Sequence, residues 1–293
     1  MLGLCLVLSG CRDATGGSTG LEDDTQDTVG SVDSGDSGGA ESSPIYTAQD
    51  VGQLVAELAE TGLPTARELR DSYQTLMLNG DEGCPGSATE IEDLLEGCTS
   101  ETGWYFGGLL TFVTEEVEDE EGRRAKNFWT DTCDFQIVSP TGVALIGGGD
   151  IEGRWQQQGS ERLVSTSMVK GTWIYPESEH SWLSAGMSMD LAFRLDREEG
   201  ADNLNLWGTF GTPGIDLYLD NLYFDGNEAC GGQVSSGTSW LRQADGTWYE
   251  MVWAEDCSGC FTVEWDFTED LGEACIDLSG LKATVVAELE VEP

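Results

Sequence analysis

The stretch LSAGMSMDLAFRLD, residues 183–196, decides the fold class of this chain. Every second residue from Leu183 to Leu195 is apolar, and the residues between them are small, polar or charged. Because successive side chains of a β-strand point to opposite faces, this alternation predicts a strand with one buried face and one wet face. A helix would instead repeat its apolar residues every three or four positions.

The same period-two pattern recurs over much of the chain, for example at residues 215–220 and 261–268. Between Trp104 and Leu289 we count about ten such segments, with no helical pattern between them. The residues Gln243-Ala-Asp-Gly246 separate two of them and are typical of a hairpin turn. Short connections and one-sided alternation predict an antiparallel β meander that forms a barrel, a half-barrel or a sandwich.

Residues 44–100 show a helical period and are expected to form a segment that packs on the sheet. Two N-cap signals, at Thr47 and Thr65, each precede apolar residues spaced three and four apart. A third short helix is expected over residues 88–96. The fold class is therefore mainly β, or α+β by element count, with two to three short N-terminal helices before a β domain at residues 101–293.

The chain is strongly acidic: its 293 residues include 55 acidic and 13 basic side chains, with a formal net charge of -42. Nucleic acid is excluded as a partner, because phosphate binding needs clustered Lys and Arg. Direct docking on an anionic membrane surface is disfavoured for the same reason. Such a charge is typical of a solvated surface in a salty or extracellular setting, and a dedicated cation store is the alternative.

The chain begins MLGLCLVLSGC, and Leu8-Ser-Gly-Cys11 resembles the lipobox of bacterial lipoproteins. The resemblance implies that diacylglycerol is attached to Cys11 and that residues 1–10 are removed as a signal peptide. The apolar run from Leu2 to Leu8 agrees with a membrane-partitioning region. The run is short and no Lys or Arg precedes it, so we expect a truncated signal with a basic segment upstream. The alternative is a protein that is not exported and has an apolar first turn.

Residues 11–43 are expected to be a disordered tether behind the lipid. Acidic residues, Gly, Ser and Thr occupy 25 of the 32 positions from 12 to 43, and none is aromatic. Such a segment buries too little apolar surface to fold, and as a flexible coil it spans about 30 Å. The lipid would be the link to the membrane, and Arg12 after Cys11 favours the outer membrane by resemblance to enterobacterial sorting.

Seven cysteines remain for the folded body, which in an exported chain predicts disulfides and one odd thiol. Folding the predicted hairpins favours the pairs Cys230–Cys257 and Cys260–Cys275, although sequence alone does not determine connectivity. The remaining pair would be Cys84–Cys98, around the third predicted helix, which leaves Cys133. The residues Cys257-Ser-Gly-Cys260 also match the CxxC of redox and zinc sites, but acidic neighbours raise a thiol pKa and no second ligand pair is evident.

No catalytic motif stands out in the sequence. A GxSxG elbow, a Walker loop, HExxH and a Rossmann glycine pattern are all missing, and no cofactor is predicted. The single histidine, His180, lies in an acidic loop and is expected to be solvated, and Gly147-Gly-Gly-Asp150 is expected to form a turn. A carboxylate pair for glycoside hydrolysis stays open among the 55 acids.

Two binding interpretations have support in the sequence. Ten Trp lie in or beside predicted strands, where exposed rings could stack on sugars or peptides and buried rings would simply fill the core. Oxygen ligands for Ca²⁺ also cluster along the chain, although their spacing differs from that of an EF-hand; they are Asp220, Asp225, Asn227 and Glu228.

The whole chain resembles the acidic lipoproteins that abound in myxobacteria-type genomes. The resemblance is carried by Leu8-Ser-Gly-Cys11 and the acidic tether, together with Asn79-Gly-Asp-Glu-Gly-Cys-Pro85, Gly97-Cys-Thr99, Asp256-Cys-Ser-Gly-Cys260 and Ala274-Cys-Ile-Asp277. It implies a location and a sheet architecture, and it transfers no activity and no functional residue.

We therefore predict a lipid-anchored surface protein of the cell envelope with a non-catalytic binding or structural role. We expect it to be exported and anchored in the outer membrane, with a glycan or a protein as ligand. A secreted carboxylate-dependent hydrolase and a Ca²⁺-dependent adhesin are the alternatives.

Overall fold

A computed structural model describes residues 43–63, 65–86, 93–118, 123–142, 144–158, 162–174, 187–212 and 214–292. Nearly all of them belong to one compact unit, Pro44–Pro293. The predicted signal peptide, Cys11 and almost all of the tether lie outside the described residues.

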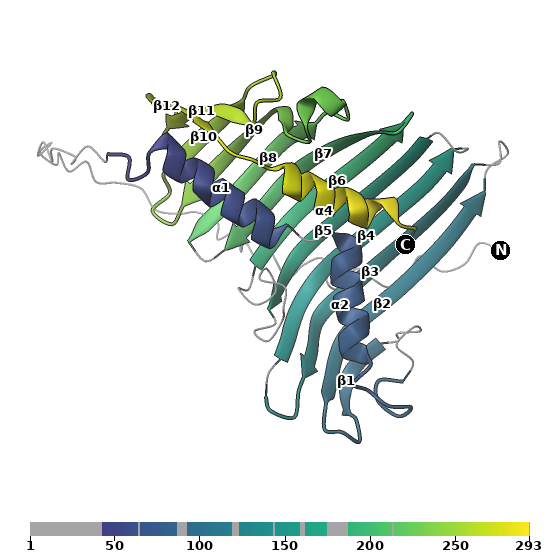
Figure 1. The fold of residues 1–293 in the computed structure, drawn as a ribbon. Coiled ribbons are helices and arrows are strands. Elements are labelled where there is room, and N and C mark those ends of the chain that lie inside the picture. Colours follow the sequence, from purple (N-terminus) through teal and green to yellow (C-terminus); the bar gives the residue numbers. More distant parts are fainter. Residues whose placement is uncertain are drawn as a thin grey trace, which may run out of the picture. The chain divides into compact units, whose positions relative to one another are not determined.

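Twelve strands form a single antiparallel sheet in chain order, as the alternating pattern predicts (Figure 1). Of these strands, β1 and β12 each pair on one side only, so the sheet stays open and does not close into a barrel. The strands are β1 (Asp93–Thr99), β2 (Tyr105–Glu118), β3 (Arg124–Val138), β4 (Ala144–Gln158), β5 (Arg162–Ile174), β6 (Met187–Glu198), β7 (Ala201–Thr212), β8 (Ile215–Phe224), β9 (Val234–Gln243), β10 (Trp248–Trp253), β11 (Cys260–Trp265) and β12 (Glu269–Cys275).

The α-helices of the described residues cover one face of this sheet, and we call it the helix face (Figure 1). Helix α1 (Ala48–Gly62) packs against β12, α2 (Ala66–Met77) against β3–β5, and α4 (Ser279–Glu290) against β5–β7. A short 3₁₀ turn, η1 (Glu228–Cys230), precedes β9. The two predicted N-caps are confirmed, because the Thr47 and Thr65 hydroxyls accept hydrogen bonds from the backbone N–H groups of Asp50 and Glu68.

The core lies between the helices and the sheet. Along β6 the predicted apolar alternation is buried from Met189 to Leu195, and Phe193 and Leu195 are fully shielded from solvent. Its neighbours on β7 and β8 contribute Phe210 and Phe224 to the same layer. Ala192 on the opposite face of β6 is also buried. One face of the period-two pattern is therefore the helix face, and the opposite face, here called the outer face, is turned to solvent.

The third predicted helix is wrong over its second half, because residues from Asp93 onward form strand β1. Residues 87–92 lie outside the described part of the chain. A nine-residue helix is marginal in water, since few hydrogen bonds repay its nucleation. Pairing with β2 provides more partners, with Thr99 opposite Tyr105 and Cys98 opposite Phe106.

Helix α4 is absent from the sequence prediction, which assigned strands up to Leu289. Its segment is rich in β-branched residues, which favour strands in isolation. The segment is helical because Leu281, Val285 and Leu289 repeat at four-residue spacing, and all three are buried in the core. Arg197 of β6 hydrogen-bonds Glu290 at 2.6 Å and lowers the pKa of that carboxyl, which ties the end of the helix to the sheet.

The glycine run Gly147-Gly-Gly-Asp150 lies inside strand β4 and does not form the predicted turn. Gly149 has a φ of 150°, and a Cβ there would lie 1.9 Å from the backbone oxygen of Lys170 on β5. On its other side, β3 has a bulge between Thr132 and Phe135. Glycine and a bulge at the same level of a sheet allow the strands to bend sharply and to approach closely.

Candidate functional site

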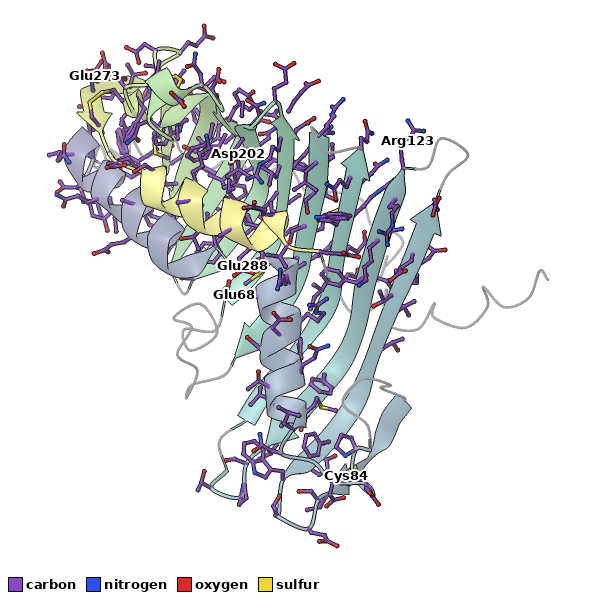
Figure 2. All side chains as sticks on the ribbon, turned by 45° about the vertical axis from the view of Figure 1, so that its right-hand side comes forward. Glu68, Cys84, Arg123, Asp202, Glu273 and Glu288 are labelled. Carbon is purple, nitrogen blue, oxygen red and sulfur yellow. A yellow bond between two sulfur atoms is a disulfide. The ribbon has the colours of Figure 1, made fainter. Side chains whose placement is uncertain are left out.

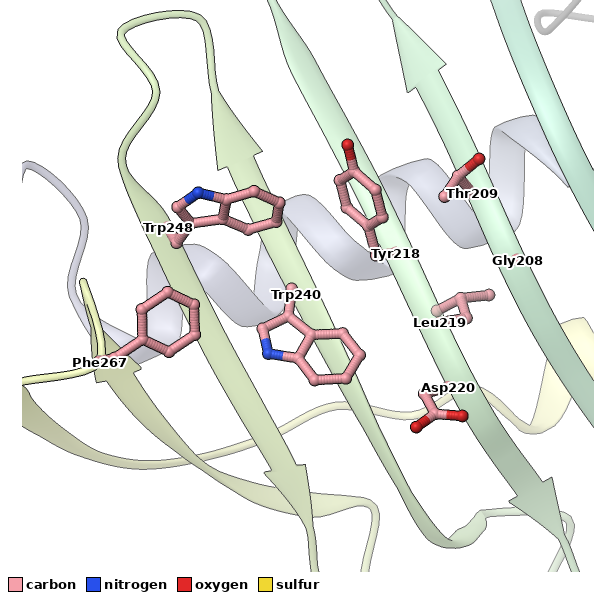
Figure 3. Close-up of a pocket in the computed structure, with 8 residues that line it drawn as sticks. All are labelled: Gly208, Thr209, Tyr218, Leu219, Asp220, Trp240, Trp248 and Phe267. Carbon is pink, nitrogen blue, oxygen red and sulfur yellow. The ribbon is translucent and has the colours of Figure 1, made fainter.

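An aromatic pocket lies on the outer face, away from the helices (Figure 3). Its volume is about 480 Å³, and it opens widely to solvent. Three neighbouring strands, β7–β9, supply most of its wall, and Trp248 at the start of β10 and Phe267 in the β11–β12 turn complete it. The lining residues are Gly208, Thr209, Tyr218, Leu219, Asp220, Trp240, Trp248 and Phe267.

The register of the sheet brings these side chains together. Thr209 of β7 lies opposite Tyr218 of β8, and Tyr218 lies opposite Trp240 of β9. Trp240 in turn lies opposite Glu250 of β10. Because directly opposed residues share one face, Thr209, Tyr218 and Trp240 form a row across three strands, on the face that the helices leave uncovered.

Ring contacts and hydrogen bonds hold the aromatic groups in place. The rings of Tyr218 and Trp248 lie 5.1 Å apart, and those of Trp248 and Phe267 lie 6.4 Å apart. The indole N–H of Trp240 donates to Glu250 at 3.0 Å, and the guanidinium of Arg242 lies 5.4 Å from the Trp248 ring. The indole polar group of Trp240 is thus satisfied, and the pocket wall is preorganised before a ligand arrives.

Phe267 is held at the pocket at an energetic cost. It lies in the tight β11–β12 turn, where Asp266 and Phe267 have φ values of 48° and 58°. Residues other than glycine pay of order 1–3 kcal/mol for such a left-handed conformation. The ring is nevertheless 53% exposed, so it gains little from burial. Strain combined with exposure of a large apolar ring is typical of a binding surface.

The polar rim of the pocket centres on Asp220. A bulge in β8 places Asp220 and Asn221 together, and Asn221 adopts a φ of 50°. The Asn221 amide donates to the Asp220 carboxylate at 2.7 Å, and the Asn205 amide donates to Asn221 at 3.3 Å. One carboxylate oxygen and the Thr209 hydroxyl thus flank an apolar floor, which suits a ligand that has both an apolar face and hydroxyl groups.

Comparisons with protein-family models, curated proteins and solved structures found no match.

The eight tryptophans whose side chains the structure describes divide between the core and the outer face. Trp253 and Trp265 are buried, and Trp104 and Trp155 pack partly buried against the core. Trp240 and Trp248 line the pocket, while Trp129 and Trp207 are exposed on the outer face. Neither Trp182 nor the side chain of Trp173 is among the described parts of the structure. The sequence could not separate these sets, because both faces of a strand carry Trp.

The four predicted Ca²⁺ ligands are not gathered into one site. Asp220 points from the outer face, and Asp225 follows the end of the same strand, five residues and about 17 Å further along. The side-chain oxygens of Asp225 and Asn227 accept backbone hydrogen bonds from Asn227 and Ala229, and Glu228 is exposed at the start of η1. These local bonds form a turn and a helix cap, which explains the residue types without a cation.

The three predicted disulfides are present: Cys84–Cys98, Cys230–Cys257 and Cys260–Cys275. The CxxC motif is therefore neither a dithiol nor half of a zinc site, since Cys257 and Cys260 bond to different partners. Cys133 lies in β3, and its side chain is outside the described parts. Three disulfides fit a protein that folds outside the cytoplasm. None of the described helices is long and apolar enough to span a membrane.

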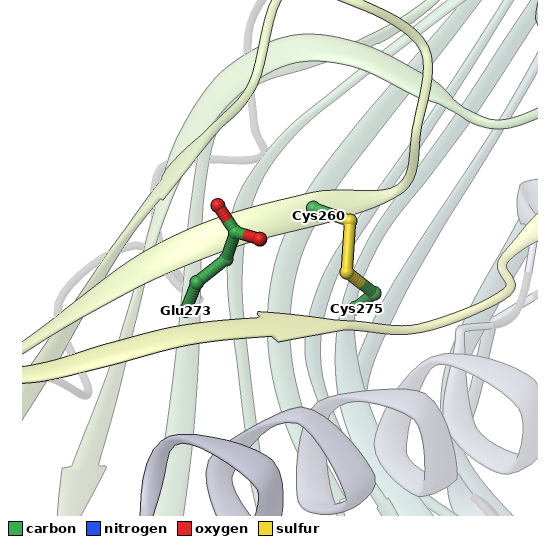
Figure 4. A group of neighbouring side chains, drawn as sticks. All are labelled: Cys260, Glu273 and Cys275. Carbon is green, nitrogen blue, oxygen red and sulfur yellow. A yellow bond between two sulfur atoms is a disulfide. The ribbon is translucent and has the colours of Figure 1, made fainter.

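One group of possible metal ligands occurs among the described residues: Glu273 beside Cys260 and Cys275 (Figure 4). The two cysteines lie directly opposite each other on β11 and β12, and their sulfurs are joined. A disulfide offers no thiolate, so one exposed carboxylate is left, which is too little for a metal site. The Cys260–Cys275 disulfide is therefore a structural link between β11 and β12. Glu273 beside it lies far from Cys84, which belongs to a different disulfide (Figure 2).

A hydrolase site would need two carboxyl groups that converge in a cleft. Asp220 is the only carboxylate among the residues that line the aromatic pocket. Glu250 stands nearby on β10, but its carboxylate is engaged by the Trp240 indole. His180, the one histidine, lies outside the described residues. The described pocket therefore has the composition of a binding site.

Proposed function

We propose that this protein is a lipid-anchored protein of the cell envelope that binds a saccharide at the aromatic pocket and does not transform it. The observation that carries the proposal is the set of four aromatic side chains around one open pocket, with a carboxylate and a hydroxyl at its rim.

The chemistry of the pocket matches that of a sugar ring. Sugar rings expose an apolar C–H face, which packs on the flat faces of Trp, Tyr and Phe, and a rim of hydroxyls. Asp220 accepts hydrogen bonds from such hydroxyls, and Thr209 accepts or donates them. The net charge of -42 repels polyanionic glycans, so neutral saccharides are favoured.

Binding is tested by titrating the full chain with neutral oligosaccharides, namely gluco-, xylo-, manno-, galacto- and chito-oligosaccharides. Tryptophan fluorescence and calorimetry report the affinity. We expect one series to bind, and Trp248→Ala to weaken it about tenfold, because a stacked ring and its apolar contact are lost.

The matched control is Val252→Ala, which removes an apolar group that is 49% exposed on the same strand outside the pocket. Its affinity should equal that of the wild type. Absence of binding across all five series, or equal weakening by both substitutions, would refute the proposal.

The anchoring part of the proposal rests on the lipobox-like Leu8-Ser-Gly-Cys11, the acidic tether and the disulfides. Acylated Cys11 would hold the domain to the membrane, and the tether would let it reach about 30 Å outward. In bacteria that express the chain with a lipoprotein signal sequence, an alkyne-tagged palmitate should label the wild type. Cys11→Ala should lose the label, and a label that persists in this variant would exclude acylation at Cys11.

A further inference from the structure

The outer face carries a second set of exposed apolar side chains beside the pocket: Trp129 on β3, Met168 on β5 and Trp207 on β7. Their exposed fractions are 38%, 47% and 36%. The register places them in one line across the sheet, because Trp129 lies opposite Glu152, which lies opposite Met168. Ala192 then lies between Met168 and Trp207. We call these three residues the apolar row.

The spacing of the apolar row is regular. Its members lie on every second strand, so neighbours are about 10 Å apart. The residues between them are short or polar: Glu152 on β4 and Ala192 on β6. Ala192 is only 5% exposed although it faces outward, because its cross-strand neighbours Met168 and Trp207 flank it. The apolar row therefore presents three large exposed apolar side chains, which are separated by one carboxylate and one short side chain.

The apolar row leads directly into the aromatic pocket. Trp207 is followed by Gly208 and Thr209, which line the pocket. Across from Trp207, the bulge of β8 presents Asp220, which also lines it. From Trp129 on β3 to Trp248 on β10 the continuous surface crosses seven strand spacings, or about 34 Å.

We infer that the apolar row is a second platform for the same ligand, and that the ligand is an extended, neutral glycan chain lying across the strands. This inference rests on the proposed function. A chain of linked sugars has repeated apolar faces that can stack on successive platforms, and hydroxyls that reach the polar groups between them. Glu152 and Asp190 stand within and beside the apolar row, and Lys170 pairs with Asp190 at 3.5 Å.

Other chain-like ligands fit this surface less well. A peptide binds a sheet through the backbone of an edge strand, whereas the apolar row crosses β3–β7 in the interior of the sheet. A polyanionic chain meets a protein of net charge -42 and acidic groups along the row. A lipid surface would need to bury Glu152 between Trp129 and Met168, which is costly for a carboxylate.

The test is the dependence of affinity on chain length, measured by calorimetry on the full chain with the neutral series that binds. The disaccharide reaches the pocket alone, and the octasaccharide is long enough to reach both platforms. We expect the octasaccharide to bind the wild type at least tenfold more tightly than the disaccharide, because a second linked contact adds to the first.

Variants separate the two platforms. Trp129→Ala should weaken octasaccharide binding about fivefold and leave the disaccharide unchanged, whereas Trp248→Ala should weaken both. Leu78→Ala is the control for both ligands, because it removes an apolar side chain that is 75% exposed at the end of α2, away from the outer face. Equal affinities for the two lengths, or no effect of Trp129→Ala, would overturn the extended-chain inference while leaving pocket binding intact. Tight binding of alginate or of a Lys-rich peptide in place of all neutral chains would overturn both proposals.

Discussion

Replacing Cys260 and Cys275 together by Ala is expected to lower the free energy of unfolding by about 3 kcal/mol. The bond closes a loop with a sequence separation of 15 residues. In the chain-entropy model, removing the bond raises the conformational entropy of the unfolded chain, which stabilises the unfolded state by about 3 kcal/mol. The two cysteines lie directly opposite on β11 and β12, so their removal also unpins the last hairpin of the sheet. Urea unfolding followed by tryptophan fluorescence measures the change.

Reduction of all three disulfides should have a larger effect. The separations are 14, 27 and 15 residues, and three such loops together contribute about 9 kcal/mol. That is comparable to the whole stability of a typical domain, about 5–15 kcal/mol, so a strong reductant should unfold the chain at moderate temperature. The Ala double variant without reductant is the reference. A melting temperature that stays the same under full reduction would contradict the expected role of the bonds.

The second large effect is expected from Gly149→Ala in β4. A Cβ at this position would lie 1.9 Å from the Lys170 oxygen, and both atoms belong to paired strands in the interior of the sheet. The backbone φ of 150° is also one that residues with side chains rarely adopt. Steric overlap and strain together should cost about 3 kcal/mol or more.

The matched control for this substitution is Gly280→Ala in α4. A Cβ there has no atom within 4 Å, and alanine favours the helix, so stability should rise by up to about 1 kcal/mol. Both variants are measured by urea unfolding. If Gly149→Ala unfolds at the same urea concentration as the wild type, β4 and β5 do not need the close approach.

The same glycine shows why part of the fold escaped sequence reasoning. Three glycines in a row are usually read as a turn, since glycine weakens strands. Here the run lies inside a long strand, and the close approach to β5 requires a residue without a Cβ at Gly149. That requirement comes from contacts between neighbouring strands, so the local sequence pattern does not show it.

Helix α4 was not predicted from the sequence for a related reason. Thr284, Val285 and Val286 favour a strand in isolation, and the segment begins without a side-chain cap. The helix is selected by the helix face of β5–β7, against which its buried residues pack. The N-terminal helices, by contrast, carry their own caps and stripes, and both were predicted.

The sequence predicted the residue types of the binding site but not their arrangement. Ten Trp indicated either a core or an exposed platform, and the alternation could not say which. Register decides it: Trp240 shares the outer face with Tyr218, whereas Trp253 lies on the helix face and is buried. The proposed Ca²⁺ group failed for the same reason, since residues near in sequence are carried apart by an extended strand.

The sequence by itself determined the mainly β class, the meander and the first two helices, and it favoured the three cysteine pairs without determining them. Those features depend on interactions between near neighbours: the period of side chains along a strand, short hairpins and local caps. Tertiary structure decided which face is covered by helices, which glycines permit close approach, and which aromatic rings meet in the pocket. These depend on how twelve strands align side by side, and that alignment is set by packing across the whole sheet.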